Sequence, residues 1–151
     1  MAVADSNLFD SWIAALSGAL GRPIEWDGQS ECVLDFDGDI EVVLAAVPET
    51  DLLGARAPLT FEGDAVSPAM LRAALESNYS RFAPGFAIAL EPGTGQLVLI
   101  AALPPAMVTQ EGLTDLLAAL LQIVPHLRMQ LPLGDTDLES RDTQAFQIRG
   151  W

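Results

Sequence analysis

The sequence predicts an α+β domain in which three helices and an antiparallel sheet follow the order α-β-β-β-α-β-β-α. Three observations lead to this class: apolar residues recur at helical spacing in three segments, short apolar segments lie between them, and turn sequences join neighbouring short segments. Strands joined by short turns pair antiparallel. A chain of 151 residues fits one domain, which we expect over residues 1–131, with an acidic, flexible tail over residues 132–151.

The first helix is expected to begin at Asp5 or Ser6, either of which can cap its start, and to end before Gly21 and Pro23. Its large apolar residues fall on one stripe that includes two aromatic rings: Leu8, Phe9, Trp12, Ile13, Leu16 and Leu20. Such a stripe either packs against the core of the domain or forms a docking patch for a partner.

Three strands are expected after the first helix. Cys32, Leu34 and Phe36 alternate with Glu31, Val33 and Asp35, which predicts a strand over residues 31–36. A turn at residues 37–39 leads into a return strand over residues 40–47. A third strand is expected over residues 52–61. Pro58 confines that segment to a sheet edge, a bulge or the end of the strand, because proline has no N–H group to donate.

The second helix is expected over residues 67–78, because a serine-proline pair at its start supplies a cap and a proline that the first helical position tolerates. Its apolar face comprises Met70, Leu71, Ala74 and Leu75. A second hairpin follows, with strands over residues 86–90 and 96–101 and a turn at residues 92–95.

The last helix opens near Thr109 and carries a leucine-rich stripe: Leu113, Leu116, Leu117, Leu120, Leu121 and Val124. Pro125 either ends or bends this helix, because its ring removes a backbone hydrogen bond and crowds the preceding turn.

Both faces of the predicted sheet are apolar. Val42 and Leu44 point to one side while Val43 and Ala45 point to the other, and the strands of the second hairpin follow the same pattern. Burial of apolar area is worth about 25 cal/mol per Å², and three helices in a small domain can hardly cover two faces. We expect a second subunit, a partner polypeptide or a small ligand on the second face; the alternative is a monomer whose own helices cover both.

Charge and cysteine content limit the possible partners and the compartment. The formal net charge is −14, and all seven cations are arginines, which disfavours nucleic acid and anionic membranes and favours basic or neutral partners. Cys32 is the single cysteine, so an intramolecular disulfide is impossible and a reducing cytosol fits. The N-terminus lacks the pattern of a secretion signal, and no segment is long and apolar enough for a membrane span. We therefore expect a soluble, cytoplasmic protein.

The sequence offers no convincing catalytic, metal or cofactor site. His126 and Cys32 are too few for a zinc site, and a nucleophile-base pair would depend on His126 alone. The acidic residues at 35, 37, 39 and 41 lack the glycine and glutamate positions of a calcium loop and fit a solvated hairpin tip. The glycines near residue 94 lack the lysine of a phosphate loop. We expect a protein that is not an enzyme and that needs no metal or cofactor.

Two segments carry a family resemblance. The string LRAALESNYSRFAPGFAIALEPGTGQLVL, from Leu71 to Leu99, resembles the central region of class I type III secretion chaperones, the Tir chaperone (CesT-like) family. The string CVLDFDGDIEVVLAAVPE, from Cys32 to Glu49, is similar to the first hairpin of that family. The resemblance extends from about Leu8 to Arg128, and the absence of lysine, the C-terminal tail and Pro125 depart from the family pattern.

The resemblance implies a cytosolic chaperone of a Gram-negative bacterium that keeps a secreted effector soluble and competent for secretion. The effector's N-terminal segment would wrap around a homodimer in extended form, laying apolar side chains on the first helix and the sheet and adding a strand to a sheet edge. Candidate effector contacts are Leu8, Phe9, Trp12, Ile13, Leu16, Val98 and Ile100. Candidate dimer contacts, implied by the resemblance, are Met70, Leu71, Ala74, Leu75 and Asn78. The alternative is a bacterial interaction or sensory domain of the same fold that binds a folded partner or a small ligand.

Overall fold

The computed structural model describes residues 6–26, 31–80 and 85–131 of the chain. These residues form three α-helices and five strands in the order that the sequence predicts. In chain order the elements are α1 (Ser6–Leu20), β1 (Cys32–Phe36), β2 (Ile40–Ala46), β3 (Leu53–Pro58), α2 (Pro68–Ser80), β4 (Phe86–Leu90), β5 (Leu97–Leu103), a 3₁₀ turn (Pro105–Met107) and α3 (Gln110–Gln130). The tail predicted over residues 132–151 lies outside the described residues.

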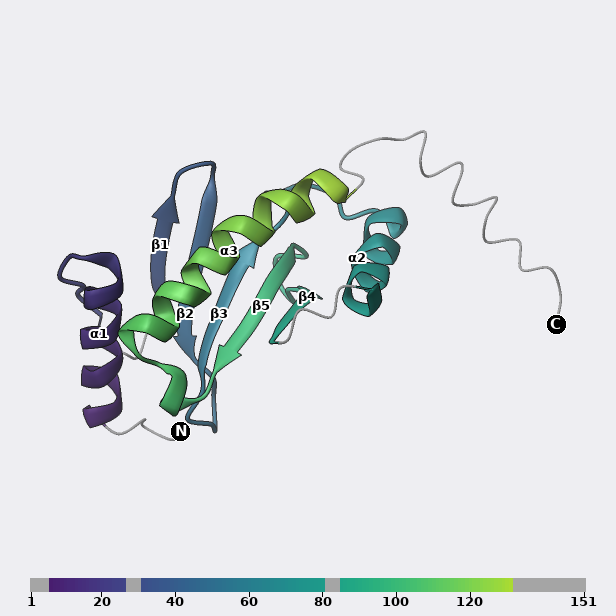
Figure 1. Ribbon diagram of the computed structural model, residues 1–151. Coiled ribbons are helices and arrows are strands. Elements are labelled where there is room, and N and C mark those ends of the chain that lie inside the picture. The colour runs from purple at the N-terminus through teal and green to yellow at the C-terminus, as the bar shows by residue number, and fades with distance from the viewer. Residues whose placement is uncertain (1–5, 27–30, 81–84, 132–151) are drawn as a thin grey trace, which may run out of the picture.

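The five strands form one antiparallel sheet in the order β1-β2-β3-β5-β4, so β1 and β4 are its edges (Figure 1). The sheet confirms the α+β class. Of the three positions open to Pro58, the structure shows the strand end: Pro58 is the last residue of β3, which lies in the middle of the sheet between β2 and β5. Beyond it the Leu59 N–H donates to the Leu97 carbonyl at 2.7 Å, and the Thr60 hydroxyl accepts a hydrogen bond from the Leu97 N–H at 3.1 Å.

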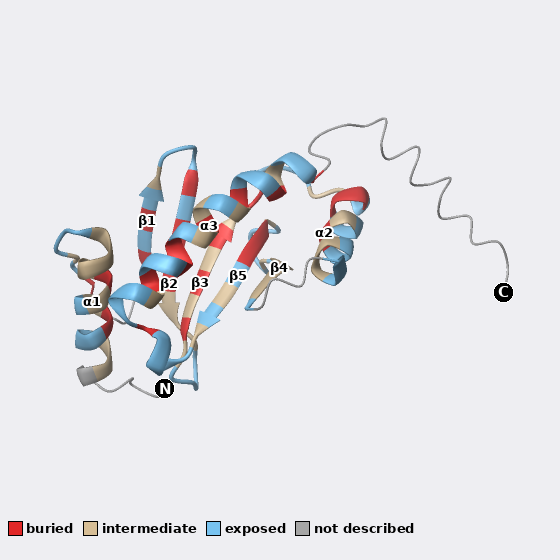
Figure 2. Ribbon diagram, viewed as in Figure 1, coloured by how far each residue is buried: buried red, intermediate tan, exposed pale blue. Residues whose placement is uncertain are grey.

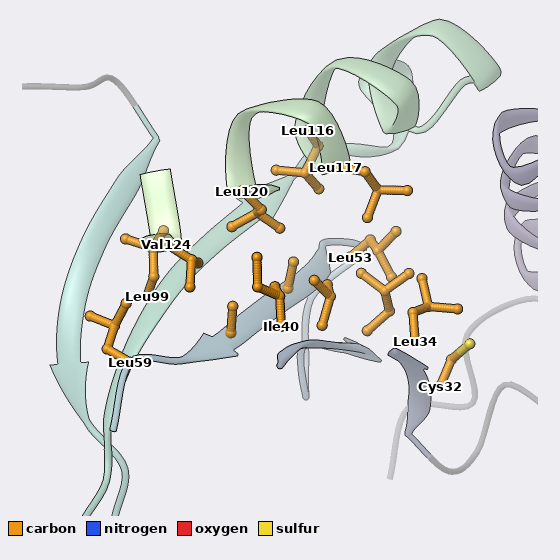
Figure 3. Close-up of a cluster of buried hydrophobic side chains, with 14 of the residues drawn as sticks. Cys32, Leu34, Ile40, Leu53, Leu59, Leu99, Leu116, Leu117, Leu120 and Val124 are labelled. Carbon is orange, nitrogen blue, oxygen red and sulfur yellow. The ribbon is translucent and has the colours of Figure 1, made fainter. Parts of the chain in front are cut away.

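One layer of helices covers one face of the sheet. α3 runs across that face, with α1 beside it at the β1 side and α2 beyond β4 (Figure 1). The leucines of α3 point toward alternate residues of the strands and form the core with them (Figure 3). The outward side of α3 is exposed, whereas its sheet-facing side is buried (Figure 2). α1 and α2 add Trp12, Leu16, Met70 and Ala74 to the same core.

The helix α3 continues for five residues beyond Pro125 and ends at Gln130, so of the two effects expected of Pro125 the structure excludes that it ends the helix. Tertiary packing stabilises the last turns, because Val124 and Leu127 are buried in the core. Arg128 also donates hydrogen bonds to the carbonyls of Asp39 at 3.0 Å and Pro58 at 2.9 Å. These contacts offset the hydrogen bond that a proline removes from a helix.

Candidate protein-binding site

The sheet has a second face whose residues lie outside the buried cluster that the sheet forms with the helices. Alternate residues of each strand point away from α3, and none of them belongs to the buried cluster that contains side chains of all three helices. We call this surface the open face. Its residues are Val33, Asp35, Glu41, Val43, Ala45, Gly54, Arg56, Pro58, Ala87, Ala89, Val98, Ile100 and Ala102. Within the described chain the helices therefore cover one face only, as the sequence predicts.

Half of the open face is a shallow hollow of about 630 Å³ lined mainly by apolar residues, with Arg56 as the one charged residue among those that line it. Small residues form its floor, among them Ala45, Gly54 and Ala102. A Cβ atom at Gly54 would lie 3.0 Å from a methyl group of Val47, so a larger side chain would crowd the wall of the hollow. Ile100 stands beside the floor with 39% of its surface exposed. A shallow hollow that is mainly apolar can accept large apolar side chains from a partner.

Two apolar residues of the open face are less accessible than the sequence suggested. Val98, a predicted effector contact, is only 2% exposed, because it lies between Pro58 and Ala89 of the neighbouring strands. Val43 is similarly buried and lies opposite Arg56. The expectation of direct contact therefore does not fit the burial of Val98, whereas Ile100 remains exposed.

Arg56 occupies the centre of the open face and binds two carboxylates that come from opposite edges of the sheet. Its Nη2 atom lies 2.7 Å from Glu31, just before β1, and its Nε atom lies 3.0 Å from Glu91, just after β4. Sequence reasoning missed this set of ion pairs, because the three residues are far apart in the chain. The alternation of the strands was the signal that could have placed them on one face.

The two edges of the sheet differ in what they offer a partner. On β4, the Asn78 side chain accepts from the Ile88 N–H at 2.8 Å and donates to the Ile88 carbonyl at 3.0 Å. This amide occupies the backbone N–H and C=O of Ile88, in the middle of the edge strand, and ties α2 to it. β1 pairs only with β2 among the described residues. Asn78 was predicted at a dimer interface, and within the subunit its amide binds Ile88, so its place at that interface stays a prediction.

A groove of about 780 Å³ lies along β1, lined by Ile13 of α1, Trp26 and the residues of β1 near Val33. Leu8, Phe9 and Ile13 of the predicted contact stripe are half-buried. Trp12 and Leu16 are each 1% exposed, and the Trp12 ring packs against Phe9 and Trp26 at centroid distances of 5.2 and 6.2 Å.

The expectation that Trp12 and Leu16 contact an effector directly does not fit this burial. Trp26 lies beyond the end of α1, and helical spacing alone could not show that it covers the stripe.

The exposed surface of α2 carries a second apolar stripe. Leu71, Leu75 and Tyr79 follow one another at four-residue spacing, and the last two are 69% and 90% exposed. Met70 and Ala74, which were also predicted at the dimer interface, are buried in the core. The dimer interface stays a prediction, and it depends on Leu71 and Leu75, with Tyr79 as a residue that the prediction missed.

The described residues contain no candidate metal site. No three metal-binding side chains gather within residues 6–26, 31–80 and 85–131. Burial raises the pKa of the Cys32 thiol, which lowers the fraction of the reactive thiolate at neutral pH. No helix in the described part of the chain is long and apolar enough to cross a membrane.

The chain matches one protein family, and solved structures share its fold. The model of the Tir chaperone protein (CesT) family matches residues 11–128. A search of curated proteins found no match. The chain is similar to a structure of the ExsC-ExsE complex, with a TM-score of 0.70 and 21% identity over 88% of this chain and 100% of the other.

Two further solved structures share the fold. One is that of the HopA1-SchA chaperone-effector complex, with a TM-score of 0.62 and 18% identity, covering 81% of this chain and 94% of the other. The other is the Yersinia pestis type III secretion chaperone SycH in complex with a fragment of YscM2, with a TM-score of 0.59 and 21% identity. That match covers 79% of this chain and 98% of the other.

Proposed function

This chain belongs to the Tir chaperone protein (CesT) family, and we therefore propose that it is a cytosolic type III secretion chaperone that binds the N-terminal segment of a secreted effector in extended form. The bound segment stays soluble and competent for secretion. Two structures with the same fold are complexes of a chaperone with a partner polypeptide, which supports this proposal. The function is binding and not catalysis.

The open face is the observation that carries the proposal. A sheet with one face packed on a core and the other in water should place polar residues on the wet side. Here the wet side carries Val33 and Ile100 and an apolar hollow. Apolar side chains of an effector gain about 25 cal/mol for each Å² that they remove from water at this surface.

The groove along β1 offers the second part of the binding surface. An edge strand has unpaired backbone groups, to which an extended peptide can add a further strand. β1 is the edge suited to this mode, because Asn78 already occupies backbone groups of β4. Ile13 and Trp26 then contact side chains of the added strand.

The proposed active unit is a homodimer formed through α2. Leu71, Leu75 and Tyr79 expose a continuous apolar stripe that a second copy can bury. The two open faces of such a dimer give an extended effector segment two apolar surfaces along its path.

Co-expression tests the proposal. The N-terminal region of a secreted protein encoded beside this chain should be soluble with the chaperone and aggregate without it. The Ile100→Asp variant should lose this effect, because a charge on the open face opposes apolar docking. Met129→Asp is the matched control, since Met129 is an exposed apolar residue near the C-terminal end of α3. Equal solubility of the effector with wild type and Ile100→Asp would contradict the proposal.

A second candidate function is the binding of a small apolar ligand in the hollow of the open face. Its volume of about 630 Å³ falls within the range of small-molecule sites. A monomer that binds an apolar dye in this hollow and leaves every tested effector segment insoluble would favour this candidate.

A further inference from the structure

Two carboxylates face each other on the open face without a cation between them. Asp35 of β1 lies directly opposite Glu41 of β2, and both side chains are exposed. Within the described residues neither carboxylate takes part in an ion pair. Like charges directly opposite one another in a sheet are destabilising. The pair therefore costs the free subunit stability.

The arginines beside this pair are engaged elsewhere. Arg56 binds Glu31 and Glu91. Arg128 donates to the backbone carbonyls of Gly38, Asp39 and Pro58, and its guanidinium lies 5.1 Å from the centre of the Phe61 ring. Neither cation neutralises Asp35 or Glu41, although Arg128 lines the same hollow of about 660 Å³ as the two carboxylates.

The acidic pair and the apolar hollow lie at opposite ends of the open face. Ala45, in the floor of the apolar hollow, and Glu41 stand on the same strand four residues apart, which is about 13 Å in an extended chain. Phe61, half-exposed, lines the acidic end. A single extended segment that runs along the strands therefore reaches both ends.

We propose that the open face selects an effector segment in which alternate large apolar side chains are followed, about four residues later, by arginine or lysine. The apolar side chains lie in the hollow, and the basic side chain lies between Asp35 and Glu41, beside Phe61. The occupant is the effector itself, because a basic segment complements both this pair and the net charge of −14. This inference rests on the proposed function and adds the sequence that the site prefers.

Peptide binding tests the inference. The probe is a fluorescent synthetic peptide with leucine at alternate positions of one half and arginine at alternate positions of the other. The double variant Asp35→Asn, Glu41→Gln should bind it about ten-fold more weakly than wild type, which corresponds to about 1.4 kcal/mol for two exposed ion pairs. The salt dependence of binding should decrease as well. The melting temperature should not fall, because the substitutions relieve like-charge repulsion.

The matched control is the double variant Asp10→Asn, Asp115→Asn, which removes two exposed charges from α1 and α3, on the helix side of the sheet. It should change the affinity less than two-fold. Unchanged affinity of the Asp35→Asn, Glu41→Gln variant would overturn the inference. A change in its sedimenting mass would also overturn it, because the pair would then belong to a contact between two copies.

Two further peptides separate this inference from the proposed function. In one, glutamate replaces arginine; in the other, serine replaces leucine. If Ile100→Asp weakens the arginine and glutamate peptides equally and wild type binds them with equal affinity, the charge selection is overturned and apolar docking stands. If wild type binds the serine and leucine peptides equally, apolar docking on the open face fails.

Discussion

Asn78 shows how one side chain can decide which edge of a sheet is free. Its amide has a donor and an acceptor in the arrangement of a backbone peptide group, and both bind Ile88 of β4. The Asn78→Ala variant should lower the free energy of unfolding by about 2 kcal/mol, because it removes two partly buried hydrogen bonds and leaves backbone groups of β4 without partners. Chemical denaturation measures this change.

Ser80→Ala is the control for Asn78, because the exposed Ser80 hydroxyl donates only to the Glu76 carbonyl of the same helix. It should change the free energy of unfolding by less than about 0.5 kcal/mol. An equally small effect of Asn78→Ala would show that the amide does not hold α2 against β4.

Trp12 and Ile13 are neighbours on α1 with different predicted roles. Trp12→Ala should reduce the free energy of unfolding by about 3–5 kcal/mol, because a large buried ring is removed from the contact with Phe9 and Trp26. Ile13→Ala should reduce stability less and weaken effector binding more, because Ile13 lines the groove along β1.

Denaturation and binding titrations of both variants provide the measurement. A Trp12→Ala protein with native stability and lost effector affinity would show that Trp12 belongs to the binding surface and not to the core.

The sequence predicts this stripe but not which of its residues face the core. Helical spacing places Leu8, Phe9, Trp12, Ile13 and Leu16 on one side of α1, and all of them pack on or beside the core. Trp26 lies beyond the helix and closes over part of the stripe, and periodicity carries no information about such a residue. Periodicity also cannot predict the ion pairs of Arg56, because their partners Glu31 and Glu91 are distant in the sequence.

At the scale of the elements, α2 presents a surface that a single subunit leaves exposed. Leu75→Asp should split the proposed homodimer, because the interface would have to bury an unpaired charge. The monomer should stay folded, since Leu75 is already 69% exposed in the single subunit. Analytical ultracentrifugation should show half of the wild-type mass, while the control Met129→Asp keeps the full mass. An intact dimer of Leu75→Asp would place the interface elsewhere.

The order and approximate bounds of the elements followed from local signals. Ser67 caps α2 by accepting a hydrogen bond from the Met70 N–H at 3.2 Å, and Thr109 caps α3 by accepting from Gly112 at 3.0 Å. The length of α3 did not follow from such signals. Pro125 weakens the helix locally, and the packing of Val124 and Leu127 and the hydrogen bonds of Arg128 come from segments distant in sequence.

At the scale of the whole molecule, one layer of helices meets a sheet that is apolar on two sides. Successive residues of a strand point to opposite faces, and apolar residues at successive positions therefore predicted that both faces are apolar. The small number of helices predicted that they would leave one face uncovered. The net charge of −14 favours a basic partner segment and opposes association of two like-charged copies through the uncovered face. The apolar hollow of the open face, the net negative charge and the free edge at β1 together favour an extended, partly basic polypeptide as the partner.

Side-chain footprinting of the free protein and of its effector complex tests the open face most directly. Carbene labelling reports the exposure of individual side chains. Val33 and Ile100 should lose most of their label when the effector binds, whereas Met129 on α3 should keep its label. Unchanged labelling of Val33 and Ile100 in a complex that protects Met129 would contradict the account, because the effector would then bind the helix side of the molecule.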